Sequence, residues 1–312
     1  MDIGLVLGGG GARGYAHIGA LRALLEHDCQ PVAMSGCSMG GLVGAFFAAG
    51  YSPDDMQKLI EDTPKVSLLE VGARGGLIGG GGIERFLSKH LPETFEELSL
   101  PLAVTAVDVQ KGELVVLRSG PLVPALRATS ALPGILTPVK HQGRYLIDGG
   151  LLNNLPVDVI SSMTLEPIVA VDIAAPPNRK LDFGDDEGGM SWPDKLRNVL
   201  SSDVSELGEQ VQNAFSGATP DLFARSLTIE LFMKSFDIPQ TILTETRLSL
   251  HPPALLIRPE LDSQFGVEDF ERLDEAVEAG YRGATERLKE FLSSSDGEKK
   301  YKQTAIDKDH SA

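Results

Sequence analysis

Short apolar runs alternate with longer segments of helical periodicity through the first fifty residues. Asp2–Leu7 is an apolar run of strand length, and Tyr15–His27 repeats its apolar residues at helical spacing. A second short apolar run, Val32–Ser35, precedes the strongly apolar segment Leu42–Ala49, which ends at a glycine. Strand, helix, strand and helix in this order predict parallel strands joined by right-handed crossovers.

The same pattern continues along the rest of the chain. Ser52 followed by Pro53 predicts a helix start, with Ser52 as the N-cap. Further strands are expected at Leu102–Asp108, Glu113–Arg118, Arg144–Ile147, Ile168–Ile173 and Leu255–Ile257, and further helices at residues 83–91, 121–129, 154–163 and 265–292. The fold class is therefore predicted to be α/β, with a mostly parallel central sheet.

Two regions depart from this alternation. Residues 72–82 are rich in glycine and residues 176–194 in Pro, Gly and Asp, so both are expected to be loops. Residues 195–245 are expected to form a helical insertion. Its apolar stretch Leu227–Phe236 fits either a core helix or the lining of an acyl channel. Residues 1–292 are predicted to be one domain, followed by a disordered polar tail at 293–312.

Composition narrows the classes of function. The chain has 312 residues, 42% of them apolar, and 44 acidic against 28 basic residues, for a net charge of −16. Such a charge disfavours nucleic acid as a partner. The two cysteines and six histidines show no metal-ligand spacing, so no metal is expected. No basic leader precedes an apolar stretch, and the longest apolar run, Leu42–Tyr51, is too short to span a bilayer. We expect a cytoplasmic protein whose membrane contacts, where it makes them, are peripheral; the oligomeric state stays open.

Two glycine-rich turns are the strongest chemical signals. The first is the run Gly8–Gly14 (GGGGARG), which follows the first expected strand. Its free backbone N–H groups are suited to hold an anion. The second is Gly36–Gly40 (GCSMG), a G-x-S-x-G sequence between a strand and a helix. Such a turn raises a serine hydroxyl, here that of Ser38, above the sheet at the N-terminus of a helix.

The first glycine run also admits a nucleotide-binding interpretation. Gly9, Gly11 and Gly14 match G-x-G-x-x-G, the turn of a dinucleotide-binding fold. That fold needs an acidic residue at the end of its second strand, whereas Asp28 precedes the second expected strand. No Walker sequence is present. A nucleotide-binding Rossmann-like enzyme is therefore kept as the alternative function.

A serine nucleophile needs a base, and no histidine is placed as one. His17, on the helix after the glycine run, is the one histidine expected near the elbow, but core or surface packing explains it better. Asp148 ends an apolar strand and is followed by Gly149 and Gly150. Ligands of open α/β sheets bind at the carboxyl ends of strands. Asp148 is therefore a candidate base, provided it is partly desolvated beside the hydroxyl.

These motifs together carry a family resemblance. The ordered set Gly9–Gly14, Gly36–Gly40, Ala128–Gly134 and Asp148–Gly150 resembles the patatin-like phospholipase family, particularly its compact bacterial members. The resemblance implies a three-layer α/β/α fold and a lipid acyl hydrolase, of phospholipase, lysophospholipase or carboxylesterase type, that needs no cofactor. The sequence departs from plant members of the family at Gly8, where they often carry Asp. This difference affects the anchoring of the glycine-rich loop more than the chemistry.

The family's site residues transfer to this sequence as expectations. Ser38 would be the nucleophile and Asp148 the base of a Ser–Asp pair acting through an acyl-serine intermediate. The oxyanion hole would involve Gly9, Gly10, Gly11 and Met39. Supporting roles would fall to Arg13, Gly14, Gly36, Gly40, Gly149 and Gly150. A non-catalytic regulator with a vestigial site is the remaining alternative.

Overall fold

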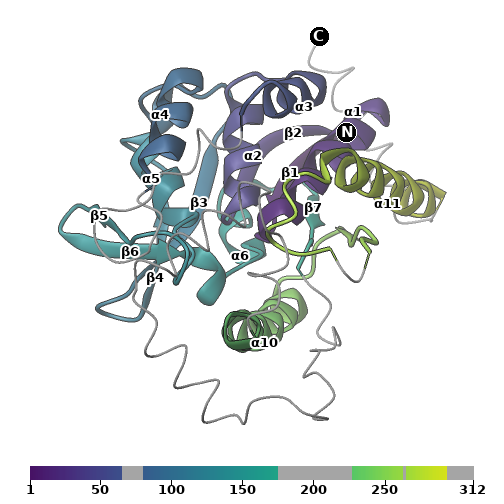
Figure 1. The fold of residues 1–312 in the computed structure, drawn as a ribbon. Coiled ribbons are helices and arrows are strands. Elements are labelled where there is room, and N and C mark those ends of the chain that lie inside the picture. Colours follow the sequence, from purple (N-terminus) through teal and green to yellow (C-terminus); the bar gives the residue numbers. More distant parts are fainter. Residues whose placement is uncertain (65–79, 175–226, 263–264, 294–312) are drawn as a thin grey trace, which may run out of the picture.

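The computed structural model describes residues 1–64, 80–174, 227–262 and 265–293. Its centre is an eight-stranded sheet (Figure 1). The strands are β1 (Asp2–Leu7), β2 (Gln30–Gly36), β3 (Leu102–Asp108), β4 (Glu113–Leu117), β5 (Val139–His141), β6 (Arg144–Asp148), β7 (Ile168–Val171) and β8 (Leu255–Ile257). They follow the order β5-β6-β3-β2-β1-β7-β8, with β4 paired to β3.

The sheet is parallel through its centre and antiparallel at one side. The strands β3, β2, β1, β7 and β8 are parallel to one another. β4 and β6 pair antiparallel with β3, and β5 pairs antiparallel with β6. The carboxyl ends of β1 and β2 therefore meet at one edge, and β6 runs in the opposite sense to β3 toward Ala106. This arrangement brings the ends of β1, β2 and β6 within reach of one another.

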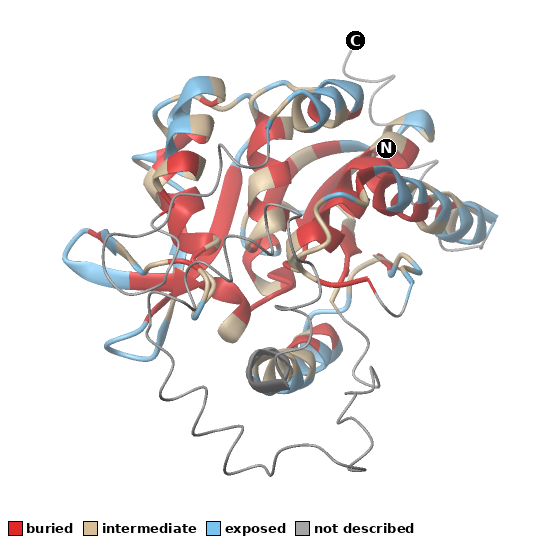
Figure 2. Ribbon diagram, in the orientation of Figure 1, coloured by how far each residue is buried: buried red, intermediate tan, exposed pale blue. Residues whose placement is uncertain are grey.

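Helices cover both faces of the sheet. The described helices are α1 (Ala16–Glu26), α2 (Met39–Ala48), α3 (Pro53–Glu61), α4 (Gly81–His90), α5 (Leu122–Thr129), α6 (Val157–Ile160), α10 (Leu227–Leu250) and α11 (Leu273–Ser293). Leu5 and Leu7 of β1 belong to the larger core, with α1, α2, α5 and α11. Val6, between them, belongs to a smaller core with α6 and the end of α10. Alternate residues of one strand thus enter two cores, which explains why the central strands are apolar throughout (Figure 2).

The α/β prediction is confirmed, and most expected elements lie within a few residues of their predicted bounds. The N-cap predicted at Ser52 is confirmed, because the Ser52 hydroxyl accepts from Asp55 N–H. The Asp55 carboxylate in turn accepts from Ser52 N–H, which completes a capping box that was not predicted. Two helices differ. The one expected at 154–163 is only the single turn α6. The one expected from Phe265 begins at Leu273, because Phe265 and Val267 use their carbonyl groups to bind the first glycine run.

Several expectations fall outside the described residues. These are the loop at 176–194, most of the glycine-rich loop at 72–82, the part of the helical insertion at 195–226 and the tail from 294 onward. The end of that insertion is helical, within α10. Among the described helices, none combines the length and apolar character needed to cross a bilayer.

The contact between α1 and α11 gives the first testable prediction. A Cβ on Gly280 would lie 1.8 Å from the Ala16 carbonyl oxygen, and one on Gly19 would lie 1.8 Å from Val277 O. The two backbones touch, so no side chain fits between them. Gly280→Ala should lower the free energy of unfolding by about 2–3 kcal/mol, measured by urea denaturation.

Gly44→Ala is the matched control within a helix. Its added Cβ would meet the Leu102 Cδ1 at 3.3 Å, a side-chain atom that can adjust. The helical propensity of alanine should then make this variant as stable as wild type or slightly more stable. Equal stability of Gly280→Ala and wild type would contradict the close packing of α1 on α11.

Candidate active site

Ser38 lies in a strained turn between β2 and α2. Its backbone has φ 50° and ψ −125°, a conformation that non-glycine residues rarely adopt. The neighbouring glycines make the turn possible. A Cβ on Gly36 would lie 2.7 Å from Gly41 N, and one on Gly40 would lie 2.1 Å from Leu7 O. The turn therefore presses the start of α2 against the end of β1, with Ser38 at the helix N-terminus.

Asp148 ends β6 beside this turn. Its side chain is buried at 3% exposure. Oδ1 accepts a hydrogen bond from Gly150 N–H at 2.8 Å and from the Cys37 thiol at 3.5 Å. Burial raises the pKa of Asp148 to about 6, and hydrogen bonds from Gly150, Ser38 and Cys37 oppose that rise. The structure thus brings Ser38 and Asp148 together and desolvates the carboxylate.

The first glycine run passes directly over Ser38. A Cβ on Gly9 would lie 3.1 Å from the Ser38 Cβ. Gly9 N–H donates to Asn154 O at 3.2 Å, so this donor is already engaged. No acceptor for the N–H groups of Gly10, Gly11 and Met39 occurs within the described residues. Of the four expected oxyanion residues, three therefore offer an available donor, and Gly9 contributes its small size.

Two residues that the sequence analysis did not identify hold this arrangement. Asn154 donates from Nδ2 to Gly9 O at 3.1 Å while its backbone carbonyl accepts from Gly9 N–H. The Thr129 hydroxyl accepts from Ser38 N–H at 2.9 Å. Both side chains are almost fully buried. A buried Asn shortly after Asp148 and a Thr within the Ala128–Gly134 segment were visible in the sequence, but no local pattern connects them to their partners.

Arg13 links the glycine run to the segment before α11. Its Nε donates to Phe265 O at 2.9 Å, and the adjacent Ala12 N–H donates to Val267 O at 2.8 Å. Gly11, at φ 59°, packs against Val267 so closely that a Cβ would lie 2.4 Å from its carbonyl oxygen. Gly14 similarly faces Met39, with a Cβ position 2.1 Å from Met39 Cγ. The C-terminal part of the chain therefore supports the loop.

Gly149 and Gly150 fit the backbone closely after Asp148. A Cβ on Gly149 would lie 2.4 Å from Thr105 O, and one on Gly150 would lie 2.6 Å from Gln240 Nε2. Gln240 of α10 also donates to Gly150 O at 3.2 Å. Helix α10 thus contacts the turn that carries the candidate base.

The residues considered for a histidine base or a nucleotide site either lie away from Ser38 or already form other hydrogen bonds. His17 is fully buried, forms its hydrogen bond with Gly8 O at 2.7 Å, and has a pKa lowered to about 4 by burial. Asp28 lies at the amino end of β1, where its backbone carbonyl accepts a hydrogen bond from the N-terminal amine of Met1. The glycine run follows the opposite end of that strand, so Asp28 is not placed to bind a ribose there. Within the described residues, no cluster of His, Cys, Asp and Glu has the arrangement of a metal site.

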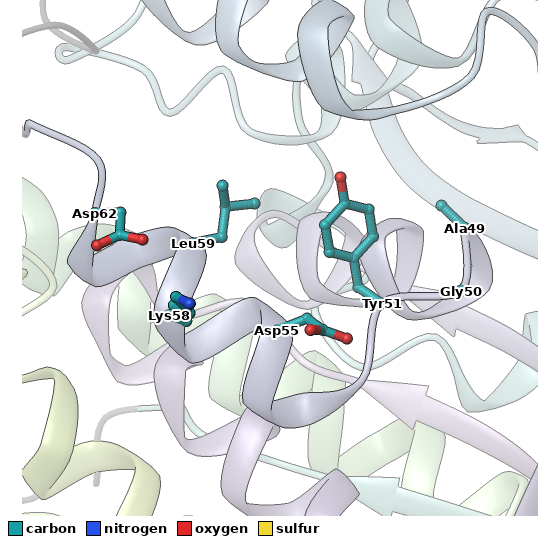
Figure 3. Close-up of a pocket in the computed structure, with 7 residues that line it drawn as sticks. All are labelled: Ala49, Gly50, Tyr51, Asp55, Lys58, Leu59 and Asp62. Carbon is teal, nitrogen blue, oxygen red and sulfur yellow. The ribbon is translucent and has the colours of Figure 1, made fainter.

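A surface depression of about 400 Å³ lies at the far end of α2 (Figure 3). It is lined by Ala49, Gly50, Tyr51, Asp55, Lys58, Leu59 and Asp62. Because α2 is ten residues long and begins directly after Ser38, roughly 15 Å of helix separates this depression from Ser38. It is therefore not part of the Ser38–Asp148 site.

Comparison with known proteins agrees with this geometry. The family model described as patatin-like phospholipase matches residues 5–160, a span that contains both Ser38 and Asp148. The chain belongs to the patatin-like phospholipase family. Membership supports a lipid hydrolase at the level of the family.

Relatives extend the similarity. An uncharacterized NTE family protein of Mycobacterium tuberculosis is 30% identical over 298 residues, covering 92% of this chain and 46% of its own length. Patatin-like phospholipase domain-containing protein 6 of Mus musculus is 31% identical over 214 residues, covering 62% of this chain and 16% of its own. The chain thus spans about half the length, or less, of these relatives. The crystal structure of VipD from Legionella pneumophila has a TM-score of 0.54 at 16% identity, over 92% of this chain and 67% of that one, and supports the fold.

The buried carboxylate of Asp148 should destabilise the folded protein at neutral pH. Its pKa is 3.8 when unperturbed and about 6 in the fold, so between these values the folded state binds more protons than the unfolded state. The free energy of unfolding contributed by this group therefore falls as pH rises, by about 2 kcal/mol between pH 4 and pH 7. Asp148→Asn should remove this dependence.

Urea denaturation of wild type and Asp148→Asn at several pH values measures the difference directly. Asp54→Asn, at an 85% exposed side chain on α3, controls for the loss of one negative charge. A constant difference between wild type and Asp148→Asn from pH 4 to pH 7 would show that the carboxylate is not desolvated.

Proposed function

We propose that the protein hydrolyses acyl esters of lipids through a covalent acyl-Ser38 intermediate, with Asp148 as the base. The observation that carries the proposal is the buried Asp148 carboxylate, which lies close enough to the Ser38 hydroxyl for that group to lower its pKa. A carboxylate with a pKa near 6 is a better proton acceptor than an exposed one and remains charged at neutral pH. It therefore suits the role that histidine plays in other serine hydrolases.

The reaction follows from this geometry. Asp148 takes the Ser38 proton as the oxygen attacks the ester carbonyl, and the resulting oxyanion is stabilised by the N–H groups of Gly10, Gly11 and Met39. Asp148 then returns the proton to the leaving alcohol. In the second half, Asp148 activates a water that attacks the acyl-serine, which releases the fatty acid and restores Ser38. The N-terminus of α2 favours negative charge on the Ser38 oxygen in both halves.

Helix α10 supports a lipid as the substrate. Gln240 holds the helix to the Gly150 carbonyl, next to the candidate base. Ile238 and Ile242, four residues apart on the same helix, are 50% and 61% exposed. Exposed apolar side chains beside a hydrolytic site suit contact with acyl chains or a lipid surface. The segment Leu227–Phe236 fits either the lining of an acyl channel or a core helix, and most of the side chains that would decide between them lie outside the described residues. That this segment lines an acyl channel is part of the proposal.

The nucleophile is tested by substitution and labelling. Ser38→Ala should reduce hydrolysis of p-nitrophenyl butyrate by at least about a thousandfold, because no covalent intermediate can form. A fluorophosphonate should modify Ser38 in wild type and should not label Ser38→Ala. Mass spectrometry of the peptide that contains position 38 measures this labelling. Ser35→Ala, in the strand before the turn, is the matched control and should retain activity and labelling. Full activity of Ser38→Ala would exclude the mechanism, and absent labelling of wild type would favour a non-catalytic regulator.

The base is tested by pH dependence. Since Asp148 must be ionised to accept the proton, log kcat/KM should rise with pH up to about 6 and then level off. The hydrogen bond from the Cys37 thiol lowers this pKa, so Cys37→Ala should move the inflection to higher pH.

Cys37→Ser restores a donor at the same position and should move the inflection back toward the wild-type value. Asp148→Asn should be nearly inactive at all pH values while remaining folded. A pH profile without an inflection near 6, or one unchanged by Cys37→Ala, would argue against Asp148 as the base.

A further inference from the structure

Arg127 is a buried cation that forms no salt bridge within the described residues. It lies in the last turn of α5, and the residue is 4% exposed. Its Nη1 is enclosed and has no hydrogen-bond partner in the part of the chain that the structure describes. Burial lowers the pKa of Arg127, and the charge of Glu84 only partly opposes this. Buried guanidinium groups are normally paired, and this chain carries 44 acidic residues from which a partner could have been drawn.

The N-terminus of α4 lies at the same place and is also unsatisfied. Gly80, the N-cap, has φ 74° and supplies no side-chain cap. The first hydrogen bond of the helix runs from Glu84 N–H to Gly80 O, so the N–H groups of Gly81, Gly82 and Ile83 have no acceptor within the helix. Gly80 and Gly82 are buried, which limits access of water to these donors.

The guanidinium points at this helix end. A Cβ on Gly80 would lie 2.0 Å from Arg127 Nη2 and 2.3 Å from Cζ, so the absence of a side chain at Gly80 makes room for the guanidinium. A cation beside the positive end of a helix dipole is repulsive. Both features become favourable when one anion lies between them and accepts from both.

We propose that Arg127 and the N-terminus of α4 form a binding site for a phosphate group. The planar guanidinium binds phosphate through two parallel N–H donors, and helix N–H groups bind the remaining oxygens. Three consecutive glycines at 80–82 let a large tetrahedral anion approach the backbone. A phosphate offers more acceptor oxygens than a carboxylate and matches this number of unpaired donors. The phosphate can come from free phosphate or from a lipid headgroup.

The site is connected to the candidate active site through α5. Arg127 lies two residues before Thr129, whose hydroxyl accepts from Ser38 N–H. The two side chains leave the helix on different sides, so the phosphate site is separate from the Ser38–Asp148 pair. Its existence does not rest on the proposed hydrolysis.

The experiment measures thermal unfolding in inorganic phosphate against sodium chloride at equal ionic strength. At a phosphate concentration about ten times Kd, the Tm of wild type should rise by about 2–3 °C above its value in chloride. Arg127→Met should abolish this rise. Arg127→Lys retains the charge but lacks the planar fork, so it should keep less than half of the rise and serves as the conservative variant. Arg247→Met, at a half-buried arginine 3.8 Å from Asp158, should respond as wild type does.

A second arm identifies the source of the phosphate. Short-chain phosphatidic acid, below its micelle concentration, is added to Ser38→Ala and to the double variant with Arg127→Met. Stabilisation that depends on Arg127 would show that the site accepts a lipid phosphate, and stabilisation by inorganic phosphate alone would show a site for the free anion. The proposal is overturned when phosphate raises the Tm of wild type no more than chloride does, or when Arg127→Met keeps the full response. Neither result bears on Ser38 labelling, so the two proposals fail separately.

Discussion

Two reciprocal hydrogen bonds between Gly9 and Asn154 join the loop over Ser38 to the segment that follows Asp148. Gly9 follows the first strand, and Asn154 follows the strand that carries Asp148. The loop above Ser38 and the turn that carries Asp148 come from separate segments of the chain, and these two hydrogen bonds connect them directly. Because Asn154 uses both its backbone carbonyl and its side-chain amide, it fixes the orientation of the loop as well as its distance.

The glycines of the site follow from this close approach. The turn at Ser38 contacts the end of β1, the loop contacts Val267, and the turn after Asp148 contacts Thr105, each at distances that exclude a Cβ. Backbone groups therefore do much of the positioning, and the side chains are left for chemistry. Groups of the two turns also make the burial of Asp148 possible. Asp148 is 3% exposed, and its Oδ1 accepts hydrogen bonds from Gly150 N–H and from the Cys37 thiol.

The sequence predicted seven of the eight strands and the two glycine turns, because these depend on local patterns, but it did not predict β5. Apolar runs of strand length mark β1 and β3 directly, and the Gly-x-Ser-x-Gly turn needs only its own five residues. The start of α11 was wrong because Phe265 and Val267 lie outside the helix to accept hydrogen bonds from Arg13 and Ala12, some 250 residues earlier. Thr129 and Asn154 were missed for the same reason: each binds a backbone group that no local pattern connects to it.

Asp148 and Arg127 are two buried charges that the fold treats differently. The carboxylate is met by an amide, a thiol and the Ser38 hydroxyl, so its burial adjusts a proton affinity. The guanidinium is met by the positive end of α4 and by no acceptor at Nη1. A folded chain can tolerate the first arrangement alone, since its donors offset part of the desolvation of the charge. The second raises the free energy of the unliganded protein, and that energy is recovered only when an anion binds, which is the physical basis for assigning a ligand to one buried charge and a catalytic role to the other.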